Sequence, residues 1–408
     1  MRTNSLLQNV LNLACLWAAM FLVPAAPAQV TFEWATVGNP GNAADPLNSD
    51  AIPGIGSVAY VYRIAKHEVT NDQYAQFLNA VAATDANLLY ASDMGANARG
   101  GITRSGVSGS FTYSVKANMG NKPVNYVSFF DAMRFTNWLH NGQPTGAQDA
   151  STTESGVYAI SDGLSESRAA DALFFVPTEN EWYKAAYHQP ATNGGDATDY
   201  WVYPTAHGFS ATPTVATANA AGDISNPGAN VANYDFGADW NGQNGNVTTV
   251  GSAELGSESY YGTSDQGGNL WEWNEGVRSG SFRVLRGGSW NANLSNLWSS
   301  VQAGDNPTVK SNNFGFRVAC PAAASLPVGT CCISNGGSCD AEGNCQENIT
   351  QTECETLGGS FLGPNISCAT ACVNGQCIPT VSHWGLLALT LVLLATGTIA
   401  LRRRTATP

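Results

Sequence analysis

The chain has 408 residues and a formal charge of −13, and only 12% of its residues are charged. This length predicts one core domain with shorter appended segments, and 43 glycines with 18 prolines indicate a loop-rich globule rather than a helical bundle. Because the chain is acidic and has no basic run outside its last few residues, the composition argues against nucleic acid as a partner.

The first 28 residues have the pattern of a secretory signal peptide. Arg2 precedes an apolar run from Leu6 to Val23, and the small residues Ala26-Pro27-Ala28 form a cleavage site. A lipid anchor on Cys15 is the alternative, but Asn12 fits poorly in the recognition motif that such an anchor needs. Export predicts a compartment in which disulfide bonds form.

Three helix starts follow in the chain. Val58 to Val69 is rich in β-branched and aromatic residues, which predicts a strand. A helix is then predicted from Thr70, which can accept from the amide of Gln73 while Gln73 reaches back. The same capping pattern starts two more predicted helices, at Ser128 with Asp131 and at Thr178 with Glu181. The apolar spacing predicts one buried stripe per helix: Tyr74, Phe77, Leu78 and Val81; Ala132, Phe135 and Leu139; Trp182, Ala185 and Ala186.

Two long segments lack such patterns. Asp85 to Ser114 and Asn141 to Ala172 are polar, small and aperiodic. Both are predicted to be surface excursions.

The stretch from Tyr260 to Arg317 combines glycines with tryptophans. The glycines permit tight turns, and the indole rings supply large surfaces to bury. Oxygen-bearing side chains stand between them, at Asp265, Asn269, Glu272 and Glu275. Such a loop suits a hard cation such as calcium better than a catalytic thiol or imidazole cluster.

Three motifs in this stretch carry a family resemblance. A Y-G-(x)4-G-G-N-x-W-E-W segment ends at Trp273, Arg286-Gly-Gly-Ser-Trp290 follows, and a G-F-R segment ends at Arg317. Their order and spacing resemble the formylglycine-generating enzyme, or sulfatase-modifying-factor, domain from about Val30 to Cys320. The resemblance implies an irregular α+β fold related to C-type lectins, with few short helices and strands. It also implies bound calcium and a groove that, in the true enzymes, accepts a cysteine-bearing sulfatase peptide.

The resemblance implies two structural calcium sites. At the first, Asn233 matches the family's first ligand, and the partner carboxylate is Asp239 or Asp235. The second site would take the Asp265 side chain, the carbonyls of Gly268 and Leu270, and the carboxylate of Glu272. Asx-type turns without metal are the alternative at both loops.

The family's copper site has no counterpart in this sequence. The oxidases place two cysteines after the G-G-S segment, and those positions fall here on Ala292 and Leu297. An arginine frequent in the linking stretch is replaced by Gln302, and Cys320 is the only cysteine of the domain. Since copper(I) needs soft thiolate ligands, neither copper nor formylglycine-generating activity is expected, and no catalytic residue is assigned. The family's iron-dependent sulfoxide synthases use a separate helical domain for their histidine ligands, and nothing in this sequence corresponds to it.

The leading functional hypothesis is therefore binding without oxidation. The candidate groove residues are Arg286, Ser289, Trp290 and Trp298, and the expected ligand is a glycan or a peptide. One alternative is an active enzyme of the sulfatase-modifying-factor family, either a formylglycine-generating oxidase or another oxidoreductase. Another alternative is a rigid spacer in a surface layer.

Three segments follow the domain, which spans 29–320. Residues 321–329 form a linker by composition. Residues 330–377 hold eight cysteines, an even number that predicts a small disulfide-rich module in an exported protein: Cys331, Cys332, Cys339, Cys345, Cys354, Cys368, Cys372 and Cys377.

Residues 378–408 resemble an IPTL-type protein-sorting signal of Gram-negative bacteria. The segment begins Ile378-Pro-Thr-Val381, and an apolar run from Gly385 to Leu401 reaches the lower edge of the ~17 to 25 residues that span a bilayer. Arg402 to Arg404 place the C-terminus in the cytoplasm. The sequence thus predicts a transmembrane helix, processing by an exosortase-like enzyme, and a location at the cell envelope or surface.

Overall fold

The computed structural model describes residues 29–48 and 52–322, and beyond them five short strand segments, 329–333, 345–349, 359–361, 372–373 and 376–377. The chain divides into two units, Met1–Cys320 and Pro321–Pro408, which are described separately. Among the described residues, no helix has the length and apolar character to cross a bilayer. The predicted signal peptide and the predicted span from Gly385 to Leu401 lie outside the described residues.

The first unit contains four short α-helices and two 3-10 turns among its described residues. They are α2 (Asn71–Val81), α3 (Ser92–Ala96), α4 (Phe129–His140) and α5 (Glu179–Tyr187), with 3-10 turns η1 (Ala191–Asn193) and η2 (Leu294–Leu297). The three predicted capping boxes are confirmed: Thr70, Ser128 and Thr178 each accept from the third helical amide, and the third side chain reaches back. All the apolar residues predicted to form the three stripes are buried.

Two sheets run through the first unit. The first has the order β1-β2-β11, with β1 (Trp34–Val37) antiparallel to β2 (Tyr62–Ala65) and β11 spanning Ala319–Pro321. The second has the order β10-β7-β8-β9, formed by β7 (Trp271–Arg278), β8 (Phe282–Arg286), β9 (Ala303–Asp305) and β10 (Phe314–Gly315). A two-stranded parallel pair, β5 (Thr214–Val215) with β6 (Val231–Ala232), lies in the loop-rich half. The strand predicted over Val58 to Val69 shrinks to the four residues of β2.

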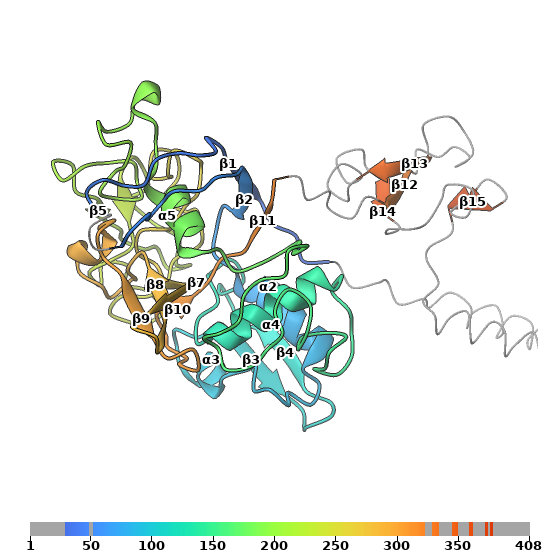
Figure 1. The fold of residues 1–408 in the computed structure, drawn as a ribbon. Helices are drawn as coiled ribbons and strands as arrows, with labels where there is room; N and C mark the ends of the chain where they lie inside the picture. Colours follow the sequence, from blue (N-terminus) through green and yellow to red (C-terminus); the bar gives the residue numbers. More distant parts are fainter. Residues whose placement is uncertain are drawn as a thin grey trace, which may run out of the picture. The chain divides into compact units, whose positions relative to one another are not determined.

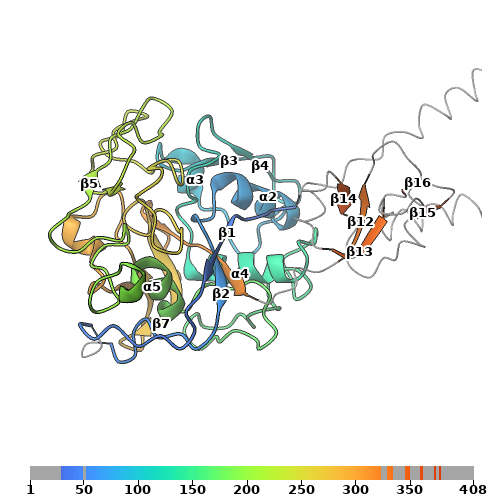
Figure 2. The same cartoon turned by 90° about the horizontal axis from the view of Figure 1, so that it is seen from above.

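The segment from Asp85 to Ser114 is more ordered than predicted. It contains α3 and most of an antiparallel hairpin of β3 (Ile102–Ser105) and β4 (Thr112–Val115), which lies beside α2 (Figure 2). Only Ile102 and Tyr113 of these strands are buried, so the sequence shows no alternation that could signal a strand. The other predicted excursion, Asn141 to Ala172, contains neither helix nor strand.

An aromatic core joins the helices to the sheets. Phe135 of α4 packs edge-on against Phe77 of α2, with ring centroids 5.3 Å apart, and against Phe316, at 5.5 Å. Trp273 of β7 is fully buried, and its indole nitrogen donates to the carbonyl of Val127 at 3.0 Å. Figure 1 shows α2 and α4 together on one side of the unit, and α5 packs against β7. The rings thereby fix the loops that carry the predicted site.

His188, which caps α5, gives a testable pH dependence. Only 1% of the residue is exposed, its Nδ1 lies 2.8 Å from the Tyr261 hydroxyl, and burial lowers its pKa to about 4. In the unfolded chain the histidine binds a proton near pH 6.5, whereas in the folded protein it does so only near pH 4. The stability that the neutral ring contributes to the folded state is therefore complete above pH 6.5 and is lost as the pH falls toward 4. Between pH 7 and pH 5, the free energy of unfolding of the unchanged protein should fall by about 2 kcal/mol more than that of a His188→Gln variant. Urea denaturation of both proteins across this range checks the prediction, and parallel stability curves would contradict it.

The second unit contains a small sheet and a hairpin. The sheet has the order β13-β12-β14, formed by β12 (Gly329–Ile333), β13 (Cys345–Ile349) and β14 (Gly359–Phe361). The hairpin pairs β15 (Cys372–Val373) with β16 (Gln376–Cys377). Cys331 is buried and disulfide-bonded. The pairing of the eight cysteines stays a prediction, because several of them lie outside the described residues.

Candidate functional site

Arg317, at the end of the G-F-R segment, organises the loops of the predicted second calcium site. Its guanidinium donates to both carboxylate oxygens of Glu272, with Nε–Oε2 at 2.6 Å and Nη2–Oε1 at 2.7 Å. It also donates to three backbone carbonyls, those of Ala65, Lys66 and Ser264, at 3.0, 2.8 and 2.9 Å. Both members of the ion pair are fully buried. Arg317 therefore joins β2, the Ser264 loop and β7 at one point.

Glu272, a predicted calcium ligand, is already fully engaged by protein groups. Besides the fork to Arg317, its Oε2 accepts a hydrogen bond of 2.8 Å from the indole nitrogen of Trp182 on α5. The structure thus places Glu272 in an ion pair between a helix and a strand. No oxygen of its carboxylate is left without a protein partner.

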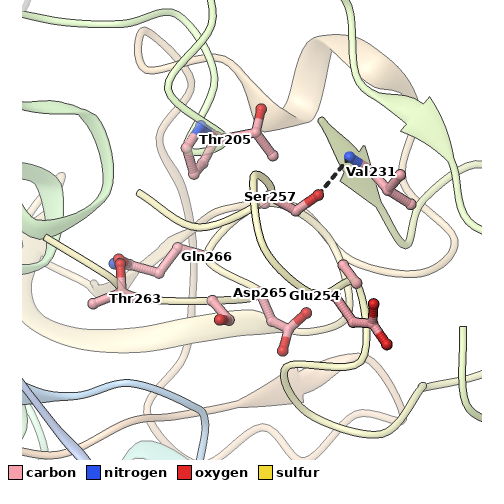
Figure 3. A pocket seen from close by; sticks show the side chains of 11 residues that line it. Thr205, Val231, Glu254, Ser257, Thr263, Asp265 and Gln266 are labelled. Atoms are coloured by element: carbon pink, nitrogen blue, oxygen red, sulfur yellow. Dashed lines mark hydrogen bonds between the residues drawn. The ribbon is translucent and has the colours of Figure 1, made fainter. Parts of the chain in front are cut away.

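Asp265, the other predicted side-chain ligand, lies at the edge of a small polar pocket. Its backbone is left-handed, with φ at 62°, and its Oδ2 accepts from the amide of Gly251 at 2.6 Å. Burial raises the pKa of Asp265, although the Gly251 amide opposes this shift. Figure 3 shows the pocket, which Asp265 lines together with Thr263, Gln266 and the exposed Glu254.

The backbone brings the two predicted calcium loops together. Asn233 forms a parallel bridge with Gly268, and the amide of Asn269 donates to the carbonyl of Asn233 at 2.8 Å. A side chain at Gly268 would collide with this carbonyl, because a Cβ atom there would lie 2.1 Å from it. Glycine is therefore required at this position. Leu270 lies two residues further on and is fully buried.

The neighbours of Asn233 differ from those that the sequence suggests. Asp239 and Asp235 are both exposed, and Asp239 accepts from the amide of Gly245 at 2.7 Å. The Asn233 side chain instead donates to the carbonyl of Asn246 at 2.9 Å, and Asn246 is fully buried. Asn246 carries no separate signal in the sequence, because it is one asparagine in an asparagine-rich loop.

Orphaned oxygens show which residues fit a hard cation. Asn233 is 2% exposed, and its Oδ1 has no hydrogen-bond partner among the described residues. The same holds for both carboxylate oxygens of Glu68, which is 1% exposed. Within the described part of the chain, no group of three or more His, Cys, Asp or Glu side chains is arranged to hold a metal ion. A cation at either place would thus need carbonyls, amides or water among its ligands, as calcium commonly accepts.

Most of the predicted groove residues lie in the interior. Arg286 is fully buried and forms an ion pair of 2.5 Å with Glu179, while its Nη1 donates to the carbonyls of Ser299 and Val301. Ser289 is also fully buried, and Trp290 is 2% exposed. Trp298 reaches solvent in part, and its indole nitrogen donates to the Tyr203 hydroxyl at 3.1 Å.

An aromatic and polar surface covers Trp290. The guanidinium of Arg99 lies 4.3 Å from the centroid of the indole ring, and Phe236 meets the ring edge-on at 5.6 Å. Phe236 is 41% exposed and left-handed, with φ at 58°. A bulky residue in this conformation is strained, and such strain is often found at functional sites.

An amide network continues this surface. The Ser289 hydroxyl donates to Asn291 Oδ1 at 2.8 Å, and Asn313 Nδ2 donates to the same oxygen at 3.2 Å. The Ser311 hydroxyl donates to Asn313 Oδ1 at 2.5 Å. Asn291 is half-buried, and its amide nitrogen donates to no other described residue. We call Phe236, Asn291 and Asn313, which lie around the buried Trp290, the amide–aromatic surface.

Ala292 and Leu297 are the residues onto which the family resemblance places the two copper cysteines. Ala292 is 7% exposed and Leu297 is fully buried, so both fill space in the core. Gln302 donates to both carboxylate oxygens of Glu179, at 2.7 and 2.9 Å. Burial raises the pKa of the Cys320 thiol to about 12, which keeps this cysteine protonated and unreactive.

The fold and the motif loops define the class of this protein: a mixed domain of short helices and small sheets, whose loops are held by buried arginine and tryptophan side chains. The family description "Sulfatase-modifying factor enzyme 1-like domain" (FGE-sulfatase) matches residues 37–322. The chain belongs to this family.

Two curated relatives are hercynine oxygenases. The protein from Mycolicibacterium smegmatis is 27% identical over 223 residues, covering 49% of this chain and 38% of the relative. The protein from Mycolicibacterium thermoresistibile is 31% identical over 193 residues, covering 41% of this chain and 37% of the relative. The chain thus spans less than two fifths of the length of these relatives.

Solved structures with similar chains include two of bacterial origin. Treponema denticola variable protein 1 has 18% identity and a TM-score of 0.41, covering 72% of this chain and 97% of that chain. PvdO from Pseudomonas aeruginosa has 16% identity and a TM-score of 0.36, covering 71% of this chain and 91% of that chain.

Proposed function

We propose that this domain binds a neutral polar ligand, a glycan or a peptide, without copper-dependent oxidation. The observation that carries the proposal is the burial of two apolar side chains, Ala292 and Leu297, at the positions that the family resemblance predicts for the copper cysteines. Neither side chain has a sulfur, nitrogen or oxygen atom that could hold a metal. The distant Cys320 cannot substitute, because its thiol is buried and protonated.

The amide–aromatic surface supports a neutral ligand. Asparagine amides both donate and accept hydrogen bonds, which matches the hydroxyl groups of a sugar or the backbone of a peptide. The exposed ring of Phe236 offers an apolar face beside them. The hydroxyls and amides of this network hold each other in place, so little side-chain freedom is lost when a ligand binds.

Calcium is proposed as a structural ion of the same domain. The orphaned Oδ1 of Asn233 fits the first predicted site, with Asn246 rather than Asp239 beside it. At the second predicted site, Asp265 is half-buried and its Oδ2 accepts a hydrogen bond only from the amide of Gly251 among the described residues. Asx-type turns without metal remain the competing hypothesis at both loops.

Binding and turnover are tested together on the full chain. We expect no uptake of copper and no conversion of a cysteine-bearing sulfatase-type peptide. We also expect binding to at least one compound of a broad panel of neutral glycans and peptides. Asn291→Ala and Phe236→Asn should each weaken that binding about tenfold, which corresponds to the loss of one hydrogen bond or one apolar contact.

The matched control is Asn306→Ala, which removes an amide from an exposed turn. This variant should bind as the unchanged protein does. Copper-dependent turnover would overturn the proposal. Absence of binding across the panel would favour the structural alternative, a rigid spacer in a surface layer.

An enzymatic function is the second candidate, because the two curated relatives are hercynine oxygenases. The chain covers 38% and 37% of the length of these relatives. Incubation with iron(II), oxygen, hercynine and a thiol donor tests this candidate. Formation of a sulfur-containing product would establish it, and no product is expected from this chain alone.

The proposed location is the cell envelope. Support comes from the sequence, namely the signal-peptide pattern before Gln29 and the IPTL-like segment from Ile378. Processing by an exosortase-like enzyme predicts that the mature protein ends before Arg402. Mass spectrometry of the C-terminal peptide in the producing cell tests this cleavage.

A further inference from the structure

We propose that Arg99 recognises the carbonyl oxygen of an acetamido group, and that the ligand of the amide–aromatic surface is a glycan of N-acetylated sugars. The inference rests on the proposed function and deepens it, because it names the class of glycan and a residue that selects it. Arg99 lies in the segment from Asp85 to Ser114, outside the motifs that carry the family resemblance.

Arg99 and Phe236 share two contacts, the buried ring of Trp290 and the backbone of Gly245. The guanidinium of Arg99 lies 4.3 Å from the centroid of the indole ring, and Phe236 meets the same ring edge-on at 5.6 Å. The carbonyl of Gly245 accepts from Arg99 Nε at 3.0 Å. A Cβ atom at Gly245 would lie 2.8 Å from the Cα atom of Phe236. The guanidinium and the exposed phenyl ring thus belong to one surface.

The guanidinium of Arg99 has a donor to spare. Nε donates to the carbonyl of Gly245 and Nη2 to that of Asn244 at 2.9 Å, whereas Nη1 donates to no described residue. Arg99 is half-exposed and forms no ion pair with the described residues, although the chain has 31 acidic residues. An oxygen of a ligand at Nη1 would therefore gain a charge-assisted hydrogen bond for which no described carboxylate competes.

Two side chains fix the turn that carries Arg99. Lys116 Nζ donates to the carbonyls of Asn97 and Gly100, both at 2.8 Å. Asn125 Nδ2 donates to the carbonyl of Arg99 itself at 2.9 Å. The backbone on both sides of Arg99 is held in place before a ligand binds, which reduces the entropy that binding costs.

The loops around Arg99 offer side chains, rather than backbone, to a ligand. The carbonyls of residues 97–100, 244 and 245 all accept hydrogen bonds from side chains of the protein itself. A peptide that binds by main-chain pairing would compete with these side chains. A sugar binds through side-chain amides and an aromatic ring, which Asn291, Asn313 and the 41% exposed Phe236 supply. The surface therefore suits a glycan better than a peptide.

An acetamido group matches the atoms of this surface. Its carbonyl oxygen would accept from Arg99 Nη1, its N–H would donate to an asparagine Oδ1, and its methyl group would pack on the ring of Phe236. A carboxylate binds a guanidinium best through two parallel hydrogen bonds, but two of the three nitrogens of Arg99 already donate to backbone carbonyls. One spare nitrogen suits a single carbonyl oxygen, and an acetamido group keeps the ligand neutral.

The test compares two neutral tetrasaccharides, chitotetraose and cellotetraose, which differ only in having an acetamido group or a hydroxyl group on each sugar. Isothermal calorimetry with the full chain should give a Kd for chitotetraose about tenfold lower than that for cellotetraose. In Arg99→Met, which keeps an apolar stem over Trp290 but has no donor, the two Kd values should become nearly equal. The matched control is Arg278→Met, at an exposed arginine that also forms no ion pair with the described residues, and it should keep the full preference.

The ratio of the two Kd values separates recognition by Arg99 from a structural role. If Arg99 only covers Trp290, Arg99→Met should weaken the binding of both sugars by the same factor, and an unchanged ratio would refute the inference. Equal Kd values in the unchanged protein, or tighter binding of the acidic tetragalacturonate, would refute it as well. Binding of a neutral peptide and of neither sugar would overturn the inference while the proposed function stands. If no neutral glycan or peptide binds, both fail together.

Discussion

Replacing Arg317 with methionine is expected to lower the free energy of unfolding by about 3–5 kcal/mol, the cost typical of breaking a buried ion pair by removing one partner. The variant leaves the carboxylate of Glu272, which is fully buried, with only the indole nitrogen of Trp182 as a donor. It also leaves the carbonyls of Ala65, Lys66 and Ser264 without the guanidinium that they now accept from. Urea denaturation in the presence of calcium measures the loss.

Two comparisons sharpen this result. Lys66→Met removes a cation whose side chain is 41% exposed and whose partner Glu33 is 71% exposed, so the change should stay within about 1 kcal/mol. The double variant Arg317→Met with Glu272→Gln should be more stable than Arg317→Met alone, because no charge stays buried and unpaired. A loss below about 1 kcal/mol for Arg317→Met would mean that water reaches the Glu272 carboxylate.

Local sequence signals predicted α2, α4 and α5 well, because each capping signal involves residues that are neighbours in the chain. Thr70 with Gln73 is one example: both hydrogen bonds of its capping box are present. Helix α3, which has no side-chain cap, was missed. The strands were harder. β2 is four residues long and the hairpin of β3 and β4 buries one side chain per strand, so neither leaves an alternating pattern.

The candidate site was predictable only in part. Glycines and acidic residues marked the loops around Asn233 and Asp265, and the backbone does bring these loops together. The sequence could not show which carboxylates form ion pairs with arginine side chains of the protein itself. The Arg317 fork to Glu272 joins residues that lie 45 positions apart in the chain. The stretch that carries the buried Glu68 is held by backbone hydrogen bonds to the distant residues Ser264 and Phe316.

Helix α5 explains why the predicted groove residues are interior. The register of β7 and β8 places Glu272 opposite Arg286, yet the two do not pair with each other. Glu272 binds Arg317 and the α5 residue Trp182, while Arg286 binds the α5 residue Glu179. The two charged side chains of the motifs, Glu272 and Arg286, thus attach α5 to the sheet.

The second large effect is expected for Arg286→Met. Arg286 is fully buried, and its guanidinium donates to Glu179 Oε1 at 2.8 and 2.5 Å and to the carbonyls of Ser299 and Val301. Methionine fills part of the space but satisfies none of these acceptors, so the free energy of unfolding should fall by about 3–5 kcal/mol. Gln302 still donates to Glu179 in the variant, which places the loss toward the lower end of this range.

This change also separates an interior role of Arg286 from a role in the groove. If Arg286 only attaches α5 to β8, the folded variant should bind the ligand of the unchanged protein with the same Kd at a temperature well below its Tm. Isothermal calorimetry beside urea denaturation measures both quantities on one preparation. Gln302→Ala, which removes the smaller contact to Glu179, should cost about 1 kcal/mol and also leave Kd unchanged. If the Arg286→Met protein is stable but binds the ligand more weakly, then Arg286 contacts the ligand in the groove, and its interior role is refuted.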